Sequence, residues 1–174
     1  MKKVLLIISL FLICGCYNST PTKEVEKYFT DYQINPEKYI SNIDYLLDFS
    51  DFSNEQREEF KKIIKNNYQN LEYNIKDEIV NANKATVITE INVYDYSRIL
   101  NEALEYKNTY IDEFNDENGY NESKYIDYKI MKLKEAKEKV KYTLDINLTK
   151  IDGKWYIDDL SREYLEKING IYNY

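Results

Sequence analysis

The strict alternation of apolar and polar residues between Val140 and Leu148 is the feature that most constrains the fold of this chain. Apolar side chains stand at every second position of this segment: Val140, Tyr142, Leu144, Ile146 and Leu148. A period of two residues places these side chains on one face of a β-strand. The sequence therefore predicts a half-buried strand, which needs neighbouring strands and a covering layer to bury its apolar face.

Two earlier runs alternate in the same way: Leu71, Tyr73 and Ile75, and then Val87, Thr89, Ile91 and Val93. Because Asn81-Ala82-Asn83 supplies a turn between them, we expect an antiparallel hairpin of residues 71–80 with residues 84–94. Asp152-Gly153 is the strongest hairpin-turn signal in the chain, and residues 154–157 would return as a short strand. Together these segments predict a curved antiparallel sheet of about four strands.

The segment before the first strand carries three helix-start signals. Thr20 precedes Pro21, Asn35 precedes Pro36, and Ser53 forms a capping box with Gln56. Apolar residues follow each signal at helical spacing: Val25, Tyr28, Phe29 and Tyr32, then Ile40, Ile43 and Leu47, then Phe60, Ile63 and Ile64, with Asn67 at the next position of the third face. The N-terminal part is therefore expected to form helices that pack on the sheet.

Helical spacing returns between the two halves of the sheet. It runs from Ser97 to Phe114, is interrupted at residues 115–119, and resumes from the capping residue Asn121 to about Lys139. We expect a helical hairpin inserted at residues 97–139, and a short C-terminal helix capped by Ser161. The predicted fold class is α+β, as a single domain over residues 21–174.

The N-terminus reads as a targeting segment. Two lysines follow Met1, an apolar run extends from Val4 to Ile13, and Cys14-Gly15-Cys16 comes next. Such a segment is typical of a secretory signal peptide, here residues 1–15, and is too short to span a bilayer comfortably. Residues 17–20 would leave a tether of ~15 Å at most when extended.

Ile13-Cys14-Gly15-Cys16 resembles the lipobox of bacterial lipoproteins. The resemblance implies cleavage between Gly15 and Cys16 and a diacylglyceryl thioether on Cys16, which would place the chain at the extracytoplasmic side of the cell membrane. Residues 16–20 would then be a lipidated cysteine and a short tether. The alternative is an ordinary cleaved signal that leaves Cys16 as a free thiol.

Several kinds of chemistry lack their usual residues. The chain has no histidine, and its two cysteines are Cys14, which would leave with the signal, and Cys16. Its four glycines never cluster into a phosphate-binding loop. In the acidic loop of residues 112–122, an EF-hand alignment on Gly119 puts Phe114 and Tyr125 at ligand positions. We therefore predict no catalytic residue, no cofactor and no metal site.

The net negative charge disfavours anionic partners. Without Lys2 and Lys3, 22 basic side chains remain against 31 acidic ones, a formal charge of −9. An acidic domain is repelled by nucleic acid and by anionic lipid surfaces. The anchor on Cys16, and not a basic patch, is therefore expected to hold the protein to the membrane.

The order of these elements, with Asp152-Gly153-Lys154-Trp155-Tyr156-Ile157 leading into the last strand, resembles small bacterial lipoproteins with a nuclear-transport-factor-2-like (cystatin-like) domain of unknown function. The resemblance implies helices packed across a curved sheet. Enzymes of that fold often use an Asp base and Tyr donors in a pocket between the two layers. Tyr142 and Trp155 could line such a pocket or belong to the core, and we favour the core. Asp145 lies on the polar face of its strand and should point away from such a pocket.

The expected function is that of a membrane-anchored, non-enzymatic surface lipoprotein, which binds a protein or envelope ligand through its sheet face or a shallow cavity. Two alternatives stay open: an isomerase- or dehydratase-like enzyme with an Asp/Tyr pocket, and a structural or immunogenic surface protein with no fixed ligand. A buried carboxylate with a raised pKa would favour the enzyme.

Overall fold

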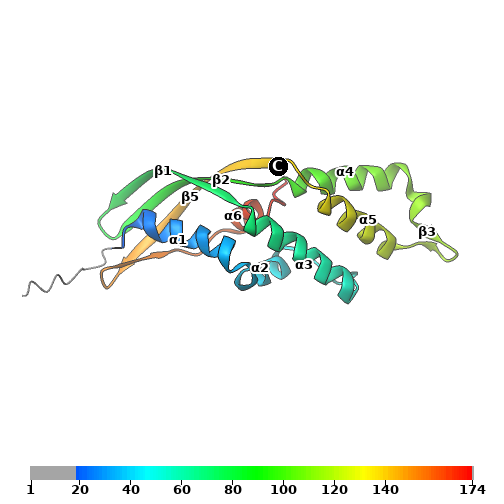
Figure 1. The fold of residues 1–174 in the computed structure, drawn as a ribbon, viewed down its shortest axis with the longest axis horizontal. Coiled ribbons are helices and arrows are strands. Elements are labelled where there is room, and N and C mark those ends of the chain that lie inside the picture. Colours follow the sequence, from blue (N-terminus) through cyan, green and yellow to red (C-terminus); the bar gives the residue numbers. More distant parts are fainter. Residues whose placement is uncertain (1–18, 174) are drawn as a thin grey trace, which may run out of the picture.

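The computed structural model describes residues 19–173. The predicted cleavage site at Gly15 and the predicted lipidation site at Cys16 lie outside the described residues. The fold is α+β, with helices packed on one face of an antiparallel sheet, as the sequence predicted (Figure 1). Among the described residues, no helix is long and apolar enough to cross a membrane.

Within residues 19–173, the larger sheet has four strands: β1 (Glu72–Asn81), β2 (Lys84–Tyr94), β5 (Lys139–Ile151) and β6 (Lys154–Ile157). Their order is β1-β2-β5-β6, and every neighbouring pair is antiparallel. The central pair, β2 with β5, runs without a register shift from Lys84 opposite Thr149 to Tyr94 opposite Lys139. Both predicted hairpins are therefore present.

The alternation in β2 and β5 produces one apolar and one polar face. Val87 lies opposite Ile146, and Ile91 lies opposite Tyr142, all on the buried face. On β5 the intervening side chains, such as Asp145, are exposed. Burying this face removes apolar area from water at about 25 cal/mol per Å², which is the main force that holds the covering helices on the sheet.

The N-terminal helices cover the apolar face of the sheet. They are α1 (Pro21–Ile34), the 3₁₀ turn η1 (Pro36–Lys38), α2 (Ser41–Leu46) and α3 (Asn54–Gln69), and α6 (Arg162–Ile168) follows near the C-terminus. Two of the three predicted N-terminal caps form: the Thr20 side chain accepts a hydrogen bond from the Lys23 N–H, and Ser53 and Gln56 make a full capping box. The predicted start at Asn35 is wrong, because its side chain makes no cap and only a 3₁₀ turn follows, so α2 begins at Ser41. In Figure 1, α1 and α3 lie below β1 and β2 and run along the length of the molecule.

The inserted segment differs in detail from its prediction. Helix α4 (Tyr96–Thr109) ends at Thr109, before the predicted end at Phe114. The 3₁₀ turn η2 (Ile111–Phe114) and the small strands β3 (Asn115–Asp116) and β4 (Gly119–Tyr120) then precede α5 (Glu122–Lys134). The second helix therefore ends before Lys139, which begins β5. Phe114, Ala103 and Tyr125 form a small core of their own. This hairpin projects from one end of the sheet (Figure 1).

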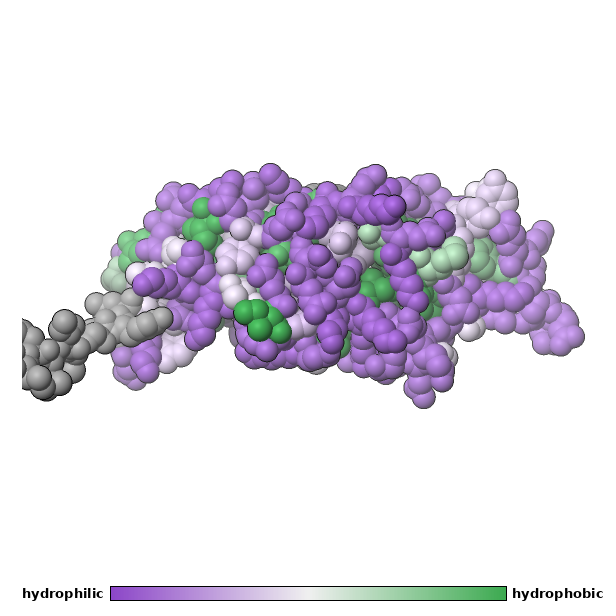
Figure 2. All heavy atoms as spheres, in the orientation of Figure 1, coloured by the Kyte–Doolittle hydropathy of each residue, from purple (hydrophilic) through white to green (hydrophobic). Residues whose placement is uncertain are grey.

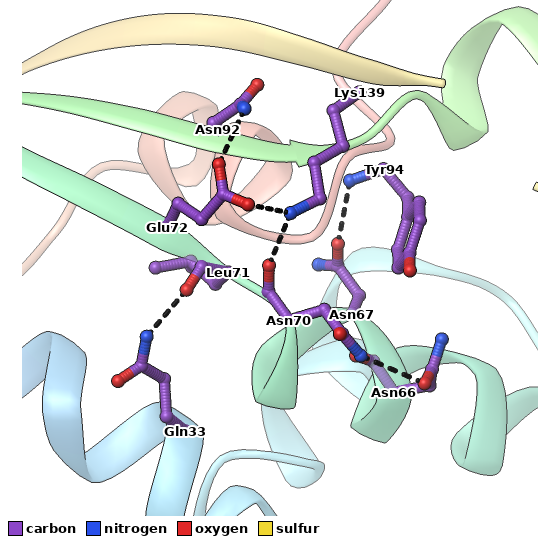
Figure 3. Close-up of polar contacts among 9 residues, drawn as sticks. All are labelled: Gln33, Asn66, Asn67, Asn70, Leu71, Glu72, Asn92, Tyr94 and Lys139. Carbon is purple, nitrogen blue, oxygen red and sulfur yellow. Dashed lines mark hydrogen bonds and ion pairs between the residues drawn. The ribbon is translucent and has the colours of Figure 1, made fainter. Parts of the chain in front are cut away.

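A polar network joins the helical layer to the sheet where α3 passes into β1 (Figure 3). Asn67 is fully buried; its amide nitrogen donates to the Ile168 carbonyl at 2.9 Å, and its oxygen accepts from the Tyr94 N–H at 3.0 Å. Nearby, Lys139 Nζ donates to the Asn70 carbonyl at 2.8 Å and to Glu72 at 2.6 Å. The Asn67 side chain thus connects α3, the end of β2 and the end of α6.

We expect Asn67→Ala to lower the free energy of unfolding by roughly 2–4 kcal/mol, because the Tyr94 N–H and the Ile168 carbonyl would each be buried without a partner. Chemical denaturation monitored by circular dichroism measures the difference. The matched control is Gln69→Ala, which removes an exposed amide from the same helix. Equal stability of the two variants would show that Asn67 does not hold the layers together.

Candidate functional site

A groove lies where α1 and η1 pass beside β6. Its volume is about 710 Å³. We call it the α1–β6 groove, and its lining is Ser19, Glu24, Lys27, Tyr28, Asp31, Lys38, Tyr39, Lys154, Trp155, Tyr156 and Ile157. Trp155 lies on β6, which pairs with β5 at the edge of the sheet. It lines the groove together with residues of α1, although the two segments are far apart in the sequence. This groove is the candidate functional site because it combines aromatic rings with fixed charges.

Aromatic rings form one wall of the groove. Tyr39 stacks on Tyr32, with ring centroids 3.8 Å apart and an angle of 14° between the rings. Tyr28 meets Tyr39 edge to face at 5.9 Å, and its hydroxyl lies 3.1 Å from that of Tyr32. Tyr156 is half exposed in the same groove. Such rings offer flat apolar faces together with polar edges, which suits sugar rings or protein side chains.

Asp31 is the carboxylate of the groove that hydrogen bonds hold in place; Glu24 also lines the groove. Its carboxylate accepts hydrogen bonds from Lys38 Nζ at 2.5 Å, from the Tyr39 hydroxyl at 2.6 Å and from the Asn35 amide at 2.6 Å. The Lys38 bond, followed by the Tyr39 and Asn35 bonds, holds the pKa of the Asp31 carboxyl well below its usual range. Asp31 is therefore ionised at neutral pH and is a poor proton acceptor.

Two tyrosines of the groove, Tyr28 and Tyr39, are poor proton donors as well. Burial, and then the hydrogen bond to Asp31, raises the pKa of the Tyr39 hydroxyl. Burial also raises the pKa of Tyr28. A general acid or base works best with a pKa near the working pH, so Asp31, Tyr28 and Tyr39 are poorly suited to proton transfer at neutral pH.

The two aromatic residues suggested by the sequence lie apart. Trp155 is 6% exposed and lines the α1–β6 groove, with Lys150 Nζ 5.4 Å from its ring. Tyr142 is 4% exposed, and its ring meets Tyr172 edge to face at 6.0 Å. Trp155 pairs with Lys150, eight residues along β5 from Tyr142, which corresponds to roughly 26 Å of strand. The two rings do not share a pocket.

Sequence reasoning missed the cluster around Asp31. One signal was available: Asp31, Asn35 and Lys38 follow one another at spacings of four and three residues, which brings them to one side of a helix. The helix breaks at Pro36, and the 3₁₀ turn that replaces it still carries Lys38 and Tyr39 back to Asp31.

Two carboxylates of the acidic loop accept hydrogen bonds from residues of the same loop. Asp116 accepts hydrogen bonds from the Asn118 N–H and the Asn121 amide, and Asp112 accepts one from Asn115. Over residues 19–173, no group of three or more acidic, histidine or cysteine side chains is placed to hold a metal ion.

The Asp31 cluster predicts a dependence of stability on pH. A carboxyl whose pKa falls on folding contributes stability above its unfolded pKa of about 4, and loses it as the pH drops toward the folded pKa. The free energy of unfolding of the wild type should exceed that of Asp31→Asn by roughly 1 kcal/mol near pH 7, and this difference should shrink toward pH 2. Urea denaturation across this range measures it, with the exposed Asp44→Asn as control. A difference that persists unchanged at low pH would exclude an ionic role.

Comparison with protein-family models, curated proteins and solved structures finds no match to this chain, so its function is inferred from the lipobox-like motif and the groove.

Proposed function

We propose that this chain is a bacterial lipoprotein, anchored by acyl chains on Cys16 at the extracytoplasmic face of the cell membrane. In this proposal its domain is not an enzyme and binds a protein or envelope ligand in the α1–β6 groove. The finer assignment that we propose is the group of small lipoproteins with a nuclear-transport-factor-2-like domain. The observation that carries the binding role is the groove itself, in which partly exposed rings surround a fixed ion pair.

The N-terminal sequence supports the anchor. A basic start, a short apolar run and the lipobox-like Ile13-Cys14-Gly15-Cys16 stand in the required order. One acyl chain binds membranes only marginally, whereas two or three give stable attachment. A diacylglyceryl group on Cys16 would therefore be sufficient without help from the acidic domain.

The electrostatics of the groove favour binding over catalysis. The isomerase-like alternative needs a carboxylate whose pKa is raised toward neutrality. Of the two carboxylates that line the groove, Asp31 is the one held by hydrogen bonds, and its three donors lower its pKa instead. A groove with partly exposed aromatic rings also weighs against a surface protein with no fixed ligand, since exposed aromatic rings are frequent in binding surfaces.

Substitution of the two cysteines tests the anchor. Cys16→Ser should abolish lipidation, so the protein should leave the detergent phase of a Triton X-114 separation or accumulate uncleaved. Cys14→Ser is the matched control, because Cys14 would leave with the signal peptide. Equal partitioning of wild type and Cys16→Ser would exclude the lipoprotein assignment.

Photo-crosslinking in intact cells tests the groove. A photoreactive phenylalanine analogue at Tyr156, inside the groove, should give a discrete crosslinked product. The same analogue at Tyr45, which is 67% exposed on α2, is the control. The Tyr156 product should weaken severalfold when Tyr28→Ala is added, because that change removes a ring of the opposite wall. Equal products at both positions, or none at either, would contradict a groove-specific ligand.

A further inference from the structure

The end of the molecule that carries both sheet turns exposes aliphatic side chains. The β1–β2 turn at residues 82–83 and the β5–β6 turn at residues 152–153 lie at the same end of the sheet, as the hydrogen bond from the Lys150 N–H to the Asn83 carbonyl at 2.8 Å shows. Ile79, Val80 and Ile151, which flank these turns, are 55%, 50% and 54% exposed. We call this surface the turn end. Figure 2 shows hydrophobic residues, in green, at this end of a mostly hydrophilic face.

The start of α1 lies at the same end. The backbone N–H and the hydroxyl of Thr22 both donate to Glu78 Oε2, at 2.9 and 2.6 Å. Glu78 is next to Ile79 on β1, so the first turn of α1 is attached beside the exposed aliphatic residues. Figure 1 shows the beginning of α1 at the end of the molecule that carries the tips of β1 and β5.

The chain between Cys16 and this attachment is short. Pro21, the first residue of α1, follows Cys16 by five residues, which span about 18 Å at full extension. If acyl chains on Cys16 enter the bilayer, as the proposed function requires, the turn end is confined to the immediate neighbourhood of the headgroups. A tethered surface also contacts the membrane at a high effective concentration, so a weak contact is sufficient.

We propose that the turn end rests on the membrane that holds the lipid anchor, with Ile79, Val80 and Ile151 inserted among the headgroups. This inference rests on the proposed function. The contact is apolar rather than electrostatic, because the lysines of the two hairpin ends, Lys84, Lys150 and Lys154, are balanced by Asp77, Glu78 and Asp152. The α4–α5 hairpin then projects away from the bilayer, at the opposite end of the molecule (Figure 1).

The bilayer suits this surface better than a second copy of the chain. Three aliphatic side chains separated by turn residues and lysines are far from the area of a stable protein interface, which buries about 800 Å² per partner. Aliphatic tips flanked by lysines match the boundary between headgroups and acyl chains, where lysine stems reach toward the phosphates.

The test uses the full lipidated chain in vesicles of phosphatidylethanolamine and phosphatidylglycerol. In the proposed lipidated chain the Cys16 sulfur forms a thioether and Cys14 has left with the signal, so a cysteine introduced elsewhere is the only free thiol. Val80→Cys and Ile151→Cys place a polarity-sensitive fluorophore on the turn end, and Ile111→Cys, 47% exposed on the hairpin, is the matched control. Circular dichroism verifies that each labelled variant is folded.

We expect blue-shifted emission at positions 80 and 151, quenched severalfold by nitroxide-labelled lipids and little changed by salt, with solvent-like emission at position 111. Solvent-like emission at all three positions, with the protein still bound to the vesicles, would overturn the contact and leave the anchor standing. A blue shift without nitroxide quenching would indicate a second copy of the chain and would also overturn it. Protein that does not float with the vesicles would refute the anchor and this inference together.

Discussion

The hydrogen bonds of the buried Asn67 side chain are the interaction on which the alignment of the helices on the sheet most depends. A polar amide in an apolar core is tolerated only when its hydrogen bonds are made, and Asn67 makes them to Tyr94 at the end of β2 and to Ile168 at the end of α6. Next to it, the Tyr68 hydroxyl donates to Asn169 at 2.7 Å. Few other alignments of α3 satisfy these groups, so the network fixes how the layers meet.

The sequence predicted the strands and most helix starts because both depend on residues that are close together in the chain. Alternation in β5 follows from its single buried face, and the Ser53–Gln56 box is a contact within one turn. The ends of the inserted helices were wrong because apolar spacing continues past them. Ala136 falls in phase with α5, yet the helix ends at Lys134 and Lys139 already pairs with Tyr94 in the sheet. Strand pairing there overrides helical spacing.

The candidate site was harder to predict than the fold because it joins distant segments. Trp155 was a candidate from the sequence alone. Asp31 and Tyr39 come into contact only because the 3₁₀ turn η1 folds back on α1. Tyr142, which is equally aromatic, is buried elsewhere on β5. Residue type and phase therefore identified aromatic residues on the inner face, and the tertiary arrangement decided which of them borders a groove.

The proposed placement of this domain at a membrane depends most on the chemical state of Cys16. Mass spectrometry of the N-terminal peptide, prepared from protein extracted from bacterial membranes, measures that state directly. The expected peptide begins at Cys16 and carries a diacylglyceryl group on sulfur. A peptide with an unmodified Cys16, or one that retains residues before Cys16, would contradict the lipid anchor and with it the proposed orientation on the bilayer.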